Sequence, residues 1–138
     1  MLTLKPVATA VVRRRETRHV QDITSGAHAL QSDEPVARGG ADAGPAPYDL
    51  LLAALGACTS ITLRMYADRK QWELGSVEVD LRFFKTNEEE RIERVVRVSG
   101  ALSDEQRTRL AEICEKTPVT KTLRAGTPIV TRLEAAAQ

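Results

Sequence analysis

An uncharged run, Leu50–Leu63 (LLLAALGACTSITL), constrains the fold of this chain more than any other feature. Pro45 and Pro47 precede the run and Asp49 stands in its first turn, a composition typical of a helix start. The apolar residues recur at helical spacing on one stripe, formed by Leu51, Ala54, Leu55, Cys58, Ile61 and Met65. The sequence therefore predicts one long helix, from about residue 47 to 70, whose stripe faces a core.

Cys58, on this stripe, has two interpretations. Free cysteine is among the most buried residue types and commonly serves as a small apolar side chain. Burial raises the pKa of a thiol, so a reactive cysteine needs a nearby cation, a carboxylate and arginine pair, or a helix N-terminus. From the helix alone, Cys58 is either a packing residue, the more frequent case, or a shielded nucleophile.

The length and charge of the chain restrict the classes of protein it can belong to. Its 138 residues predict a single domain over 1–138, and 20 basic residues nearly balance 19 acidic ones, so we expect no nucleic-acid partner. The uncharged run is shorter than the roughly 20 residues that span a bilayer, and the N-terminus lacks the order of a signal peptide. We therefore expect a cytoplasmic protein with no membrane partner, in which two cysteines indicate redox chemistry or packing.

The remaining sequence predicts an α+β fold. Three β-rich runs between residues 4 and 30 (VATAVV, HVQDIT and HALQ) predict an antiparallel meander. After Gly75, the runs SVEVDLRFF and RIERVVRVSG predict a β-hairpin around TNEEE. We expect the long helix to connect the meander to this hairpin.

Two helix starts and a last strand follow the hairpin. Ser103 and Gln106 form a capping-box pattern at the start of a second helix. Thr117-Pro118 ends this helix and begins another, with Thr as N-cap and Pro in the first helical position. We predict a final strand at about Thr127 to Leu133.

Metal and cofactor sites are not predicted. Gly39, Gly40 and Gly44 follow neither dinucleotide nor P-loop spacing, and no lysine follows them to hold phosphate. His19 and His28 lie in strand-like surroundings without a short-spaced partner for zinc. We expect neither a metal nor an organic cofactor.

The stretch HALQSDEPVARGGADAGPAPYDLLLAALGACTSITLRMYADRK, together with EKTPVTKTL, resembles the OsmC/Ohr family of osmotically induced and organic hydroperoxide resistance proteins. The resemblance covers nearly the whole chain. It implies an OsmC-like fold, with meander, central helix, hairpin, second helix and final strand, built as an intertwined homodimer with sites at the subunit interface. It also implies a thiol-dependent peroxidase that reduces organic hydroperoxides in oxidative stress defence.

The resemblance assigns roles to particular residues. Cys58 matches the family's peroxidatic cysteine. The family's activating glutamate corresponds to Tyr48, so the adjacent Asp49 becomes the candidate carboxylate. The activating arginine is expected from the N-terminal part of the chain, with three candidates: Arg15, Arg18 and, less favoured, Arg38.

The family's second, resolving cysteine is replaced by Thr117. Cys114 lies one turn earlier, roughly 5 Å away along the helix, and is a possible second thiol or a packing residue. The resemblance thus favours a single-cysteine peroxidase reduced by an external thiol or dithiol. The alternative is a non-catalytic member of the fold that binds a small hydrophobic ligand in an interface pocket lined by Cys58.

Overall fold

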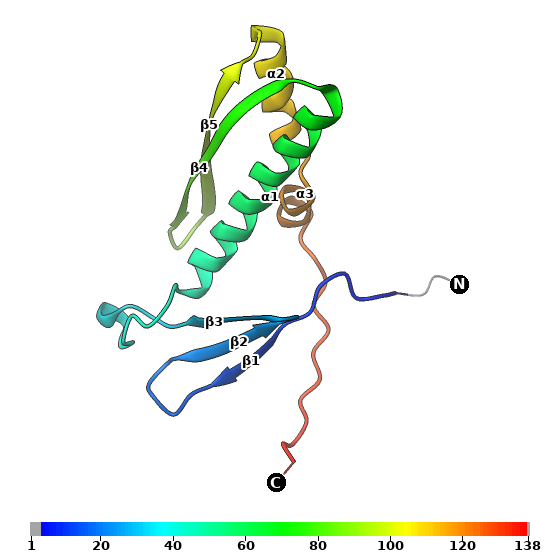
Figure 1. Cartoon of the computed structure of the whole chain (residues 1–138). Helices are drawn as coiled ribbons and strands as arrows, with labels where there is room; N and C mark the ends of the chain where they lie inside the picture. Colours follow the sequence, from blue (N-terminus) through cyan, green and yellow to red (C-terminus); the bar gives the residue numbers. More distant parts are fainter. Residues whose placement is uncertain (1–3, 138) are drawn as a thin grey trace. The chain divides into compact units, whose positions relative to one another are not determined.

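A computed structural model describes residues 4–137 and shows an α+β fold with antiparallel strands and three α-helices, as predicted (Figure 1). The elements follow in the order β1 (Val11–Arg14), β2 (Gln21–Ser25), β3 (His28–Ser32), a 3-10 turn η1 (Val36–Arg38), α1 (Pro47–Lys70), β4 (Glu73–Lys85), β5 (Glu90–Ala101), α2 (Asp104–Cys114) and α3 (Pro118–Ala125). The chain forms two compact units, divided between Ala53 and Ala54, which we describe separately.

The first unit contains the predicted meander. Its strands pair antiparallel in the order β1-β2-β3, with Val12 opposite Ile23 and Ile23 opposite Leu30. Every residue of β1 is exposed, so this sheet has little apolar surface to bury within its own unit.

Asp33, directly after β3, organises the loop that leads to α1. Its buried carboxylate accepts hydrogen bonds from the backbone N–H groups of Glu34 (2.7 Å), Ala41 (3.0 Å) and Ala43 (3.0 Å). The bond from Ala43 is the largest cause that lowers the pKa of Asp33 below its ordinary value; burial opposes it, and the other two amides add to it. The ionised carboxylate of Asp33 thereby stabilises a Gly- and Ala-rich loop, whose small residues can make few side-chain contacts.

The second unit packs helices against the predicted hairpin. Strands β4 and β5 pair antiparallel, with Val79 opposite Val96 and Leu81 opposite Arg94. The core contains residues from α1, the start of β4, the end of the hairpin and α2: Leu63, Ala67, Leu74, Leu102, Leu110, Ile113 and Cys114.

The predicted helix boundaries are confirmed where local caps define them. The Ser103 hydroxyl accepts from the Gln106 N–H, and the Gln106 side chain accepts from the Ser103 N–H, which is the capping box expected for α2. Thr117 is the N-cap of α3 and Pro118 its first residue. Both capping patterns involve only residues that are close together in the chain, so they can be recognised from the sequence.

The predicted apolar stripe of α1 is wrong. The buried residues are Leu55, Gly56, Thr59, Leu63 and Ala67, while Ile61 and Met65 are 58% and 57% exposed. A β-carbon added at Gly56 would lie 2.8 Å from Leu81 Cδ1, so the helix lies close to β4. Because this close approach needs small side chains, the face containing Gly56 and Thr59 turns inward, and Cys58 is only half-buried.

The helix α1, as folded, is also longer than the uncharged run. Among the described residues it is one helix whose length and apolar composition would suffice to cross a membrane. It carries Arg64, which donates to the backbone oxygens of Leu74 (2.8 Å) and Gly75, and two of its buried residues, Leu63 and Ala67, belong to the core of the second unit. Arg64 and these two residues connect the helix to the rest of the second unit.

The predicted final strand is not formed. Within residues 4–137, the segment 126–137 has no strand or helix after α3, and Ile129, Val130 and Leu133 are almost fully exposed. A strand requires a partner for its backbone N–H and C=O groups. The described chain supplies no such partner to this β-branched segment.

Candidate functional site

Cys58 lies in the middle of α1 and its sulfur faces a hydroxyl one turn along the helix. The Sγ atom is 4.0 Å from Oγ1 of Thr62. Residues four apart share a helix face, so this contact follows from the sequence spacing. A half-buried thiol with a polar neighbour remains accessible to a small reagent while partly shielded from water.

Thr59, the next residue, points to the interior instead. It is fully buried, its hydroxyl donates to the backbone oxygen of Leu55 (2.7 Å), and it accepts a hydrogen bond from Nη1 of Arg94 (2.9 Å). Consecutive residues on a helix are about 100° apart around its axis. The inward position of Thr59 therefore fixes the outward, half-buried position of Cys58.

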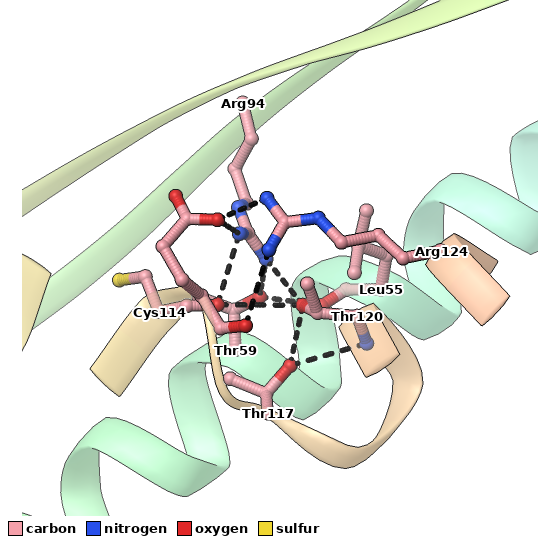
Figure 2. Close-up of polar contacts among 8 residues, drawn as sticks. Leu55, Thr59, Arg94, Cys114, Thr117, Thr120 and Arg124 are labelled. Atoms are coloured by element: carbon pink, nitrogen blue, oxygen red, sulfur yellow. Dashed lines mark hydrogen bonds and ion pairs between the residues drawn. The ribbon is translucent and has the colours of Figure 1, made fainter. Parts of the chain in front are cut away.

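Arg94 of β5 lies at the centre of a polar cluster (Figure 2). Its side chain is only 11% exposed. Nη1 donates to the hydroxyls of Thr59 and Thr120, both at 2.9 Å, and Nη2 donates to the backbone oxygen of Cys114, also at 2.9 Å. One guanidinium thus joins α1, the end of α2 and the start of α3, using the planar fork of donors that lysine lacks.

This cluster stabilises the short connection between α2 and α3. No basic residue lies in the last turn of α2, so Arg94 supplies the positive charge at its C-terminus. The hydroxyls of Thr117 and Thr120 are 2.6 Å apart, and the Thr120 N–H donates to Thr117 Oγ1 (3.4 Å). Thr117, which the sequence resemblance assigns to the family's second-cysteine position, is therefore a fully buried N-cap within the cluster.

A carboxylate at the edge of the cluster partly balances the charge. Glu115 forms an ion pair with Arg124 and lies 3.9 Å from Arg94 Nη2. Both Glu115 and Arg124 are more than half exposed. The buried guanidinium is thus held mainly by neutral oxygen acceptors.

Cys114 is buried in surroundings that disfavour its thiolate. Burial raises the pKa of its thiol above the ordinary value, and the charge of Arg94 only partly offsets this effect. Figure 2 shows the Cys114 sulfur pointing away from the Arg94 guanidinium, whereas its carbonyl group accepts from it. Cys114 also belongs to the apolar core, as its packing interpretation requires.

The other candidate residues lie in the first unit, where each has a local partner. Arg15 pairs with Asp22 (2.7 Å), and Arg18 donates to the backbone oxygen of Gly39 (3.1 Å). Asp49 accepts from the backbone N–H of Ala46 (3.0 Å), which places it as a cap on the first turn of α1.

Arg38, the third arginine candidate, lies 3.9 Å from Glu34. Among residues 4–137, no group of three or more His, Cys, Asp or Glu side chains could hold a metal ion.

Arg94 was not among the predicted site residues, although the sequence contains a signal for it. In β5, exposed residues alternate with partly buried ones, which include Ile92, Val96 and Val98. Arg94 follows the same alternation and faces inward with them. A charged residue in the inward register of an amphipathic strand needs buried partners.

Comparison with known proteins identifies the family. The chain belongs to the OsmC-like proteins, whose family model matches residues 39–132. No curated protein sequence matches the chain. It is similar in structure to an osmotic stress induced and detoxification response protein of Psychrobacter arcticus, with 16% identity, a TM-score of 0.74 and coverage of 88% of this chain and 91% of that one.

Two further structures with the same fold have more specific names. One is the organic hydroperoxide resistance protein OsmC of Legionella pneumophila, with 18% identity, a TM-score of 0.66 and coverage of 88% and 92%. The other is the organic hydroperoxide resistance protein OhrB of Bacillus subtilis, with 23% identity, a TM-score of 0.60 and coverage of 86% and 90%. At these identities the likeness establishes the fold.

Proposed function

We propose that this chain is a cytoplasmic thiol-dependent peroxidase that reduces organic hydroperoxides through Cys58. The observation that supports this most is a half-buried thiol on the central helix of an OsmC-like fold, with a hydroxyl beside its sulfur, in a chain whose other thiol is buried. The names of the Legionella and Bacillus proteins point to the same substrate class.

The reaction proceeds by nucleophilic attack of the Cys58 thiolate on the distal oxygen of the hydroperoxide. The O–O bond breaks, the alkoxide leaves and takes up a proton to give the alcohol, and Cys58 becomes a sulfenic acid. An external thiol then displaces water from the sulfenic acid to give a mixed disulfide, which a second external thiol reduces. Two electrons from the external thiols thus reduce one hydroperoxide to alcohol and water.

A single cysteine performs this cycle. Thr117 carries no thiol, and its buried hydroxyl caps α3, while burial disfavours the thiolate of Cys114. Asp49, with Arg15 or Arg18, is the proposed carboxylate and arginine pair that activates Cys58.

The active form is proposed to be an intertwined homodimer. Ile61 and Met65 present an apolar face on α1, and Ile129, Val130 and Leu133 present another on the C-terminal segment. Exposed large apolar groups of this kind favour association. The two units of the chain would then form one functional domain within the dimer.

Peroxide consumption tests the proposal. Cumene hydroperoxide and hydrogen peroxide are offered with a monothiol or a dithiol reductant, using wild type, Cys58→Ser and Cys114→Ser. Cys58→Ser is expected to abolish turnover because a serine hydroxyl does not ionise near neutral pH, whereas Cys114→Ser should retain it. Turnover retained in Cys58→Ser would refute the assignment.

An exposed apolar residue near Cys58 supports the alternative function, in which the chain binds a small hydrophobic ligand without turnover. Ile61 lies on the helix turn that follows Cys58 and is largely exposed. Wild-type protein that consumes no peroxide but binds a hydrophobic fluorescent probe, and loses that binding when Cys58 is alkylated, would favour the alternative.

A further inference from the structure

We propose that Thr62 is a further catalytic residue of this site, whose hydroxyl donates a hydrogen bond to the Cys58 thiolate and so favours the reactive form. The role in catalysis rests on the proposed function. The effect on the thiol does not, because it can be measured without peroxide.

The first support is the direction of the Thr62 side chain. A threonine inside a helix often bonds the backbone oxygen four residues earlier. Thr59 does this, with its hydroxyl 2.7 Å from the oxygen of Leu55. The hydroxyl of Thr62 is instead paired with the Cys58 sulfur, at 4.0 Å, so it is available to the thiol group.

The second support is the position of the pair. Thr59 is fully buried and its hydroxyl proton is donated to the backbone oxygen of Leu55, so it has no donor left for Cys58. Thr62 and Cys58 are both half-buried on the same side of α1. In partly desolvated surroundings a hydrogen bond to a charged group contributes more than it does in bulk water.

The third support is chemical. A hydrogen bond that a charged form accepts favours that form, and a thiolate is a better acceptor than a thiol. The separation of 4.0 Å fits the weakly bonding thiol. Cysteine turns about one side-chain dihedral, so the sulfur can approach the hydroxyl when it ionises, without backbone movement. Hydrogen bonds at reacting groups commonly shorten in this way.

Thr62 makes no covalent bond and keeps its proton. It stabilises the negative charge on sulfur before the attack on the peroxide, and the charge moves to the departing alkoxide during the attack. The thiolate is the only species it must recognise, so its contribution does not depend on which organic hydroperoxide reacts.

The test is the pH dependence of Cys58 alkylation by iodoacetamide, followed by peptide-resolved mass spectrometry. Thr62→Val removes the hydroxyl and keeps the shape, whereas Thr62→Ser keeps the hydroxyl. Thr62→Val should alkylate about three- to tenfold more slowly at pH 7, which is the size of effect expected from one ordinary intramolecular hydrogen bond. At high pH, where the thiol is ionised in both proteins, the rates should converge.

Ser60→Ala is the matched control, because it removes a hydroxyl from another face of the same helix. The proposal is supported if Thr62→Val alone is slow at pH 7 and reaches the wild-type rate at high pH. It is overturned if Thr62→Val matches wild type at pH 7, if it is slow at every pH, or if Ser60→Ala is slowed equally. Wild-type protein that consumes no peroxide would refute the peroxidase assignment and leave this readout intact.

Discussion

Arg94→Met is expected to destabilise the protein more than the loss of any exposed arginine. The guanidinium makes three hydrogen bonds of 2.9 Å from a side chain that is 11% exposed. Removing one partner from a buried charged network costs about 3–5 kcal/mol, whereas hydrogen bonds to charged groups contribute about 1.5–3 kcal/mol each. Methionine replaces the aliphatic part of the arginine side chain and adds no charge, so the packing of that part changes little.

The acceptors do not become fully unsatisfied, which lowers the expected cost. Thr59 keeps its bond to Leu55, and the Thr120 hydroxyl keeps its bonds to Thr117 and to the oxygen of Cys114. Methionine also removes the desolvation penalty of the buried guanidinium. We therefore expect a decrease in the free energy of unfolding of about 2–4 kcal/mol.

Urea denaturation at one fixed protein concentration measures this decrease, with Arg97→Met as the control. Arg97 lies on the same strand, but it is 54% exposed and pairs with Glu78 and Asp80 at 3.5 and 3.9 Å. Exposed pairs contribute about 0–1 kcal/mol. If Arg94→Met and Arg97→Met destabilise the protein equally, the cluster is not the junction that we describe.

Three further predictions follow from the same structure. Cys114 should be alkylated far more slowly than Cys58 in the native protein at pH 8, because burial raises the pKa of its thiol; equal rates would contradict its place in the core. The folded-state pKa of Asp33 lies below its unfolded value of about 3.9, so its carboxylate stabilises the fold at higher pH and this contribution is lost as the pH falls through the folded pKa. Asp33→Asn should therefore be less stable than wild type at pH 7, with the difference shrinking as the pH falls from the unfolded value of the pKa toward the lower folded one; a difference independent of pH would argue against the role of the charge. Sedimentation at micromolar concentration should show a dimer, and a folded monomer whose unfolding does not depend on concentration would contradict the proposed assembly.

The sequence predicts those parts of the fold that depend on neighbouring residues. The limits of α1, the capping box at Ser103 and the start of α3 at Thr117 are local features, because a cap needs only the next few residues. The β-hairpin follows in the same way from the alternation of two adjacent runs.

The C-terminal segment shows where local patterns are insufficient. Residues 127–133 have the composition of a strand, but β-structure requires a second backbone, and the described chain gives this segment none. Strand propensity is therefore not sufficient by itself to form a strand here. The sequence of this segment predicts a strand, but it does not show which backbone would pair with it.

The rotation of α1 has the same kind of cause and a larger consequence for the site. A count of apolar residues along α1 predicts that the face with Cys58 and Ile61 is buried. This count takes no account of Arg94, which lies 35 residues after Thr59 in the chain and donates a hydrogen bond to it. Alternation along β5 places Arg94 inward and so predicts a buried charge, but its acceptors come from three separate segments. Once Thr59 must meet this arginine and Gly56 must meet Leu81, Cys58 turns partly toward solvent. The reactivity proposed for Cys58 thus depends on a polar pairing that its own helix does not reveal.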